Sequence, residues 1–190
     1  MTGVESKPRA KRIIIEIIRQ GGGQLDGHTR LFKAFYFAHL YYFQHNPGLL
    51  SDWPIVHMPN GPGIEAGREL IEELVSAGVV AKDVIYEGPF ESARFRLVGD
   101  PQTGLDENEV KSIRDAVSFV KGKSATELSD LLHEHSRSWN NGRSGRPLNI
   151  YIDILEDARY DADREPARGR RRGLARPPGE DRPPARGARV

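Results

Sequence analysis

Residues 31–43, LFKAFYFAHLYYF, constrain the fold of this chain more than any other stretch. Their apolar side chains recur at helical spacing in two adjacent stripes, Leu31, Phe35, Ala38 and Tyr42 in one and Phe32, Tyr36, His39 and Phe43 in the other. A helix that is apolar around so much of its circumference must be enclosed by other elements. We therefore predict a central, buried helix here, and we expect His39 to be a hydrogen-bonded core histidine rather than a proton shuttle.

The remaining hydrophobic patterns predict shorter helices and one hairpin. Apolar stripes indicate helices after residue 12, from Gly61 to Gly78, over 106–122, over 124–136 and from Pro147. Pro62 is predicted in a first helical turn, where its missing N–H costs nothing. Alternating residues between 84 and 97 predict a two-stranded hairpin. The order resembles that of a winged helix, so the expected fold is mainly α, an α+β domain with a small β-hairpin.

Charge separates the chain into a body and a tail. Residues 164–190 hold nine arginines and three acids, a net charge of +6, which leaves −5 on residues 1–163 because the whole chain carries +1. The tail is also rich in proline and glycine and cannot form a core. We expect a flexible N-terminus over 1–11, a helical domain over 12–160 and a disordered Arg/Pro/Gly-rich tail over 161–190.

Two absences narrow the function classes. The chain has no cysteine, which excludes disulfides, thiolate catalysis and cysteine-bound zinc. No apolar run approaches the roughly 20 residues of a membrane span, and the N-terminus does not resemble a signal peptide. We therefore expect a cytoplasmic protein that does not bind a membrane.

The segment LSDLLHEHSRSW, residues 128–139, invites a chemical interpretation that its spacing does not favour. His133 and His135 would point about 200° apart on a helix, so they are not expected to share a metal ion. Ser136 could contact His133, but no nucleophile turn or oxyanion hole accompanies the pair. We instead expect Trp139 and the leucines to pack on the core. A contribution of this stretch to a partner-binding face remains an alternative.

Three segments together resemble the Panacea-domain family, the SocA-like antitoxins. These are YFAHLYYF within the central helix, DWPIVHMPNGPG with the helix expected after it, and LSDLLHEHSRSW, which occur in the family's order over roughly residues 12–157. The middle segment departs from the family pattern, because Asn60-Gly61-Pro62-Gly63 stands where an aromatic-Gly-Pro-Val sequence is typical. The motif residues taken as candidates for the family site or partner surface are Tyr36, His39, Trp53, Gly61, Pro62, His133, Glu134, Ser136 and Trp139.

The resemblance implies an antitoxin of a bacterial, often phage-associated, toxin–antitoxin system. Members neutralise a neighbouring toxin chiefly by binding it as a protein, and the domain pairs with many unrelated toxins. One member is a proteolytic adaptor, so a protease is a further candidate partner. The resemblance implies no enzymatic activity, no cofactor and no small-molecule substrate.

The alternative function is a winged-helix DNA-binding transcriptional regulator. The order of elements and the basic tail favour it. The acidic body opposes it, because the helix expected to enter the groove carries four glutamates and only Arg68 on its outer side. The tail itself has three open interpretations: it binds nucleic acid or another anionic partner, it folds onto the toxin, or it has no function.

Overall fold

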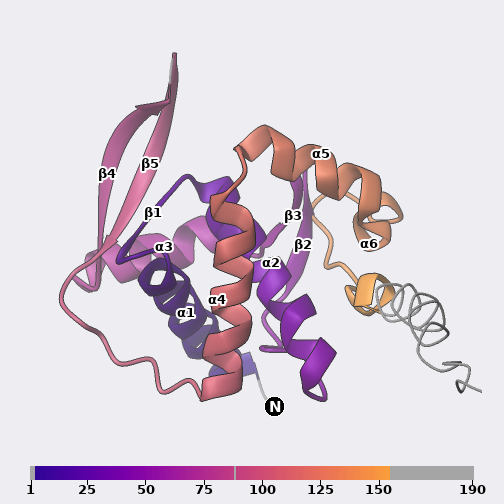
Figure 1. The fold of residues 1–190 in the computed structure, drawn as a ribbon, viewed down its shortest axis with the longest axis horizontal. Coiled ribbons are helices and arrows are strands. Elements are labelled where there is room, and N and C mark those ends of the chain that lie inside the picture. The colour runs from indigo at the N-terminus through magenta and orange to yellow at the C-terminus, as the bar shows by residue number, and fades with distance from the viewer. Residues whose placement is uncertain (1–2, 88, 155–190) are drawn as a thin grey trace, which may run out of the picture.

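The computed structural model describes residues 3–87 and 89–154, and helix α2, His28–His45, lies at its centre (Figure 1). Every residue from Leu31 to Leu40 is buried, which confirms the prediction of a central helix. Helix α4, Glu107–Lys121, makes the most extensive contact with α2, and α1, Gly3–Gln20, packs against both. These three helices therefore form the centre of the core, and buried side chains from the strands and from the other helices complete it.

Helix α1 begins at Gly3, well before residue 12, where its apolar pattern begins and where the helix was predicted to start. Its polar first turns are held by tertiary contacts. Lys7 and Lys11 both form ion pairs with Glu73, at 2.7 and 2.6 Å, and Arg9 donates to the Leu50 carbonyl at 2.7 Å. These partners are distant in sequence, which explains why local periodicity did not indicate the earlier start.

The predicted hairpin is confirmed as β4, Val80–Glu87, and β5, Phe90–Leu97. A strand that was not predicted, β1, Gln24–Asp26, pairs with the base of β5, so the antiparallel sheet has the order β1-β5-β4. The hairpin projects well beyond the helices (Figure 1). Its outer half therefore lies away from the core that its base covers.

The region from Ile55 to Ser76 differs from the prediction. Strands β2, Ile55–Met58, and β3, Gly61–Ile64, form a separate two-stranded sheet, and α3 begins only at Gly67 and ends at Ser76. Pro62 is therefore in a strand, not in a first helical turn. Gly61 has a φ of 96°, which excludes a helical start, and the register places Pro62 opposite His57.

The C-terminal half follows its local signals closely. The helices predicted over 106–122 and 124–136 are confirmed as α4 and α5, Ala125–His135, which begin after capping boxes at Asp106 and Ser124. The short helix α6, Arg137–Asn140, follows. Residues 151–154 are helical, as predicted for the segment after Pro147, with Ile154 buried and Tyr151 43% exposed. The tail expected over 161–190 lies outside the described residues.

The α+β class is confirmed, but a simple winged-helix order is not. Strands β1, β2 and β3 interrupt the series of helices before the hairpin. No helix in the described part of the chain is long and apolar enough to cross a membrane.

Candidate functional site

The carboxylate of Asp153 joins two of the segments that carry the family resemblance. Tyr36 of α2 donates its hydroxyl to Asp153 Oδ2 at 2.7 Å, and Ser136 donates to the same oxygen at 3.1 Å. Ser138 donates its backbone N–H to Asp153 Oδ1 at 2.9 Å and also its hydroxyl to Oδ2. All four residues are buried. We call this set the Asp153 network.

The Asp153 network holds the C-terminal segment against the central helix. Its members come from α2, from the α5–α6 junction and from residues 151–154, which are far apart in sequence. Ser136 also accepts the Trp139 N–H at 3.2 Å and so caps α6. His133 is not among the partners of the Ser136 hydroxyl. The serine is therefore a cap and a network donor, with no histidine base beside it.

Trp139 is stacked between two histidines. Its ring lies 4.6 Å from that of His57 and 4.2 Å from that of His133, with interplanar angles of 12° and 16°. The indole N–H donates to the Met58 carbonyl at 2.8 Å, and His133 Nε2 lies 3.2 Å from the Pro59 carbonyl. Trp139 and His133 are both half-buried. The stack fastens α5 and α6 to the β2–β3 sheet.

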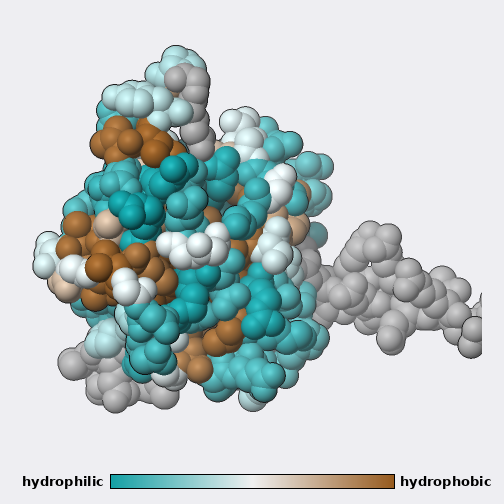
Figure 2. Space-filling model, turned by 60° about the vertical axis from the view of Figure 1, so that its left-hand side comes forward, coloured by the Kyte–Doolittle hydropathy of each residue, from teal (hydrophilic) through white to brown (hydrophobic). Residues whose placement is uncertain are grey.

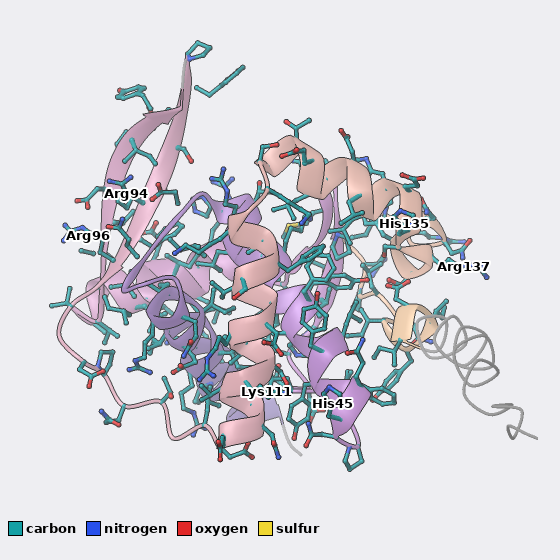
Figure 3. All side chains as sticks on the ribbon, in the orientation of Figure 1. His45, Arg94, Arg96, Lys111, His135 and Arg137 are labelled. Atoms are coloured by element: carbon teal, nitrogen blue, oxygen red, sulfur yellow. The ribbon has the colours of Figure 1, made fainter. Side chains whose placement is uncertain are left out.

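The histidines of α5 do not converge with other ligands. His135 is exposed at the end of α5 (Figure 3). Its Nε2 lies 3.7 Å from the carboxylate of the adjacent Glu134, which is also exposed. Within residues 3–87 and 89–154, no cluster of three or more histidine, aspartate or glutamate side chains is placed to hold a metal ion. Of the nine candidate motif residues, Glu134 alone is exposed.

Lys33 is a buried lysine in the middle of the central helix. It is 2% exposed, and its ammonium donates to the Pro62 carbonyl at 2.7 Å. Burial lowers the pKa of Lys33 to about 7 because the charged form loses its hydration. A Cβ added at Gly61 would lie 2.9 Å from Lys33 Nζ. Glycine at 61 thus leaves room for the lysine that holds β3 on α2.

The departure from the family pattern at Gly63 has a physical explanation. A Cβ added at Gly63 would lie 2.2 Å from the sulfur of Met58. The Met58 side chain therefore occupies the volume that a valine would fill, and a flexible thioether suits an irregular gap. Trp53 supports the same sheet, donating its indole N–H to the Glu65 carbonyl at 2.8 Å.

His39 is the hydrogen-bonded core histidine that was predicted. It is fully buried, with Nδ1 2.8 Å from the Phe35 carbonyl. Nε2 accepts the Ser51 backbone N–H at 3.2 Å, so Nδ1 carries the proton in the neutral ring. Burial lowers the pKa of His39 to about 4. The ring is therefore a neutral bridge between α2 and the loop before β2.

The largest apolar exposures among the described residues lie at the end of the β4–β5 hairpin. Tyr86 and Phe90 are each 73% exposed and Val84 is 59% exposed. Figure 2 shows hydrophobic surface close to the end of the projecting hairpin. None of these side chains belongs to a motif that we singled out. The alternation that predicted the strands did not distinguish a covered apolar face from an uncovered one.

Sequence reasoning also missed Asp153, Ser138 and Lys33. A lysine inside the apolar run LFKAF was the one visible signal, because a charge at that position must be buried with the helix. Asp153 gave no comparable signal, since it is one of several acids in its segment. The candidate motif side chains are thus mostly buried or half-buried and stabilise the domain, whereas the most exposed apolar side chains lie on the hairpin.

Comparison with known families adds one finding. The family model described as antitoxin SocA-like, Panacea domain, matches residues 31–140. The matched range begins in α2 and ends with α6, so it contains all three motif segments. No curated protein and no solved structure matches the chain.

Proposed function

The chain belongs to the SocA-like, Panacea-domain family of antitoxins, and from this membership we propose that it neutralises the toxin of a bacterial toxin–antitoxin pair by binding it directly. The observation that carries the proposal is a family match over more than half of the chain, from the central helix through the Trp139 segment. The proposed partner is a protein, and the proposed compartment is the cytoplasm.

The chemistry of the motif residues supports a binding protein over an enzyme. The hydroxyls of Tyr36, Ser136 and Ser138 are all engaged by Asp153, and both nitrogens of His39 contact Phe35 or Ser51. A catalytic group needs access to a substrate. These groups are buried and hydrogen-bonded to each other, which suits a role in shaping the domain.

Charge opposes the DNA-binding alternative. Helix α3, in the position that a recognition helix would take, exposes Glu69 and Glu72 and carries Arg68 as its only basic residue. Carboxylates on that face would be repelled by phosphates. The hairpin, in the position of a wing, carries no lysine or arginine from residue 84 to 93.

Co-expression tests the proposal. The protein encoded beside this gene is induced in a bacterial host with and without this chain, and growth is measured. We expect growth to be restored and the two proteins to co-purify. Absence of rescue, together with a promoter-fragment shift that weakens steeply with salt, would favour the DNA-binding regulator.

A pulse-chase measurement of the toxin then separates two modes of neutralisation. Direct inhibition predicts an unchanged toxin half-life in the presence of this chain. A shorter half-life that recovers when a host protease is deleted would identify proteolytic delivery instead.

A further inference from the structure

One face of the β4–β5 hairpin continues from the core into solvent. Residues that lie opposite each other in an antiparallel pair share a face. The register places Val84 opposite Ala93 and Lys82 opposite Phe95. Ala93 and Phe95 are 7% and 0% exposed, whereas Val84 is 59% exposed. This face is therefore buried at Ala93 and Phe95 on β5 and exposed at Val84 on β4.

Tyr86 extends this uncovered face. It lies two residues beyond Val84 on β4, opposite Glu91, and is 73% exposed. Strand β4 is also the outer strand of its sheet, with no further strand beside it among the described residues. Exposed apolar side chains on a free outer strand are characteristic of a surface that another protein covers. We call Val84 and Tyr86 the hairpin face.

The charges around the hairpin face indicate the kind of partner that fits it. Residues 84–93 contain two glutamates and neither lysine nor arginine. The basic residues nearer the base are already paired, Lys82 with Glu72 at 2.6 Å and Arg96 with Asp83 at 2.7 Å. An anionic membrane or a nucleic acid would meet net negative charge here. A protein with an apolar patch surrounded by basic residues is complementary.

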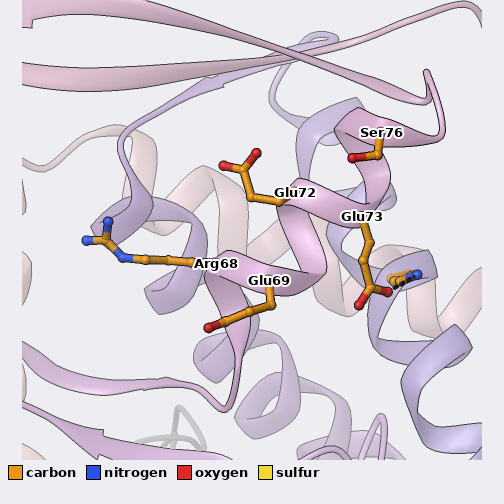
Figure 4. A pocket seen from close by; sticks show the side chains of 6 residues that line it. Arg68, Glu69, Glu72, Glu73 and Ser76 are labelled. Carbon is orange, nitrogen blue, oxygen red and sulfur yellow. Dashed lines mark ion pairs between the residues drawn. The ribbon is translucent and has the colours of Figure 1, made fainter.

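Helix α3 extends the acidic surface beside the hairpin. Glu72 points toward the strands that pass over α3, and Lys82 links it to β4 (Figure 4). A shallow hollow on this helix is lined by residues that include Arg68, Glu69 and Glu73. Glu73 is occupied by Lys7 and Lys11, whereas Glu69 is exposed and has no ion-pair partner within the described chain. Glu69 points away from the strands toward which Glu72 points (Figure 4), so it is available to a part of the partner that extends from the hairpin along α3.

We propose that the toxin docks on the hairpin face, with an apolar toxin patch covering Val84 and Tyr86 and basic toxin residues meeting Glu91 and Glu69. This inference rests on the proposed function and adds to it a location and a partner chemistry. Because the bound hairpin lies outside the core, partner contact leaves the Asp153 network undisturbed.

The test compares two pairs of variants of the full chain, with the toxic protein encoded by the adjacent reading frame as the probe. Val84→Ser combined with Tyr86→Ser removes the hairpin face, and Tyr151→Ser is its control, because Tyr151 is also an exposed tyrosine at 43%. Glu69→Lys tests the acidic surface, and Asp115→Lys is its control, because Asp115 is an exposed acid on α4 that belongs to no motif. Growth rescue, toxin affinity and the thermal midpoint are measured for each.

We expect the double variant to bind the toxin at least about 30-fold more weakly, the size of a hot-spot loss, and to lose rescue. Glu69→Lys should weaken binding about tenfold at low salt and less at high salt. Both controls should stay within about twofold of the wild type. All four proteins should keep the wild-type thermal midpoint. A photo-crosslinking amino acid in place of Tyr86 should capture the toxin, and one in place of Tyr151 should not.

Each other result overturns the inference in an identifiable way. If the wild type rescues growth and the double variant binds as tightly, the hairpin face is not the docking surface, although the antitoxin function stands. If the wild type neither rescues nor binds, both proposals fail. If the double variant instead abolishes self-association, binding to anionic vesicles or binding to duplex DNA, while toxin affinity is unchanged, the face serves that other occupant.

Discussion

Tyr36 and Tyr86 illustrate how differently two regions of this molecule use the same residue type. Tyr36 is 1% exposed and donates its hydroxyl to Asp153, whereas Tyr86 is 73% exposed at the end of the hairpin. Tyr36 belongs to the motif that identifies the family, and Tyr86 does not. The motif residues that identify the family therefore mainly hold the domain together.

If the toxin binds the hairpin face, as we propose, folding and recognition lie in separate regions of the domain. The Asp153 network and the Trp139 stack are buried or half-buried, so few substitutions at their residues preserve the packing of the domain. The hairpin face contributes little to the core, so its side chains can change with little effect on folding. A family built this way can present different surfaces on one scaffold.

The strongest test of this division is to remove the acceptor of the Asp153 network. Asp153→Ala leaves the hydroxyls of Tyr36, Ser136 and Ser138 and one backbone N–H without their buried acceptor. We expect the free energy of unfolding to fall by about 4 kcal/mol, since each buried unsatisfied group costs roughly 1–3 kcal/mol. Urea denaturation measures it. Asp130→Ala, at an exposed site on α5, should change stability by less than about 0.5 kcal/mol. A loss equally small for Asp153 would contradict its role.

The second test uses pH to examine Lys33. Its folded-state pKa of about 7 lies below the ordinary value of 10.5, so the unfolded chain binds more protons between these values. Stability should therefore fall by about 3 kcal/mol as pH drops from 10 to 7. Lys33→Met should remove this dependence and raise stability at pH 7. Lys111→Met, on the outer side of α4 (Figure 3), should leave it intact. A variant curve parallel to the wild type would show that Lys33 is solvated.

The third test applies acid to His39. Its pKa of about 4 in the folded state lies below the unfolded value of 6.5, so protonation favours the unfolded chain as pH falls below 6.5. The burial of His39 should therefore lower the free energy of unfolding by about 2 kcal/mol as the pH falls from 7 to 5. His39→Gln should lose that share of the pH dependence in chemical denaturation. His45→Gln, at an exposed position (Figure 3), should keep the pH dependence of the wild type. Equal curves for the two variants would refute the assignment of this dependence to His39.

The smallest expected effect on stability is at the hairpin face. Val84→Ser with Tyr86→Ser should change the free energy of unfolding by no more than about 0.5 kcal/mol, because both side chains are already in water. The same denaturation assay measures it. A loss of several kcal/mol would show that the hairpin is part of the cooperative core, and the contrast between the two regions would no longer hold.

Local signals were enough to predict much of the fold. The two stripes in residues 31–43 indicate a central helix, and the capping boxes at Asp106 and Ser124 locate the starts of α4 and α5 to the residue. Alternation indicates the β4–β5 hairpin. These features depend on neighbours within a few residues, which a single sequence displays directly.

The parts that were missed depend on distant partners. Gly61-Pro62 has the composition of a helix start, but Lys33 and the pairing with β2 hold it as a strand. The early start of α1 depends on contacts with Glu73 and Leu50. Asp153 is significant only because residues from two other segments, α2 and the α5–α6 junction, meet it. No spacing rule relates such positions, so the candidate site was predicted as a set of motifs without its central acceptor.

The contact between Met58 and Gly63 couples the choice of residue in β2 to that in β3. A larger residue at 63 requires the Met58 side chain to move, since the methionine sulfur occupies the place where a Cβ would be added. The methionine is flexible and half-buried, so it can turn aside and lose part of its packing against the core. These two positions should therefore vary together among relatives. A chimera that takes β3 alone from a valine-bearing relative should be less stable than one that takes β2 and β3 as a unit.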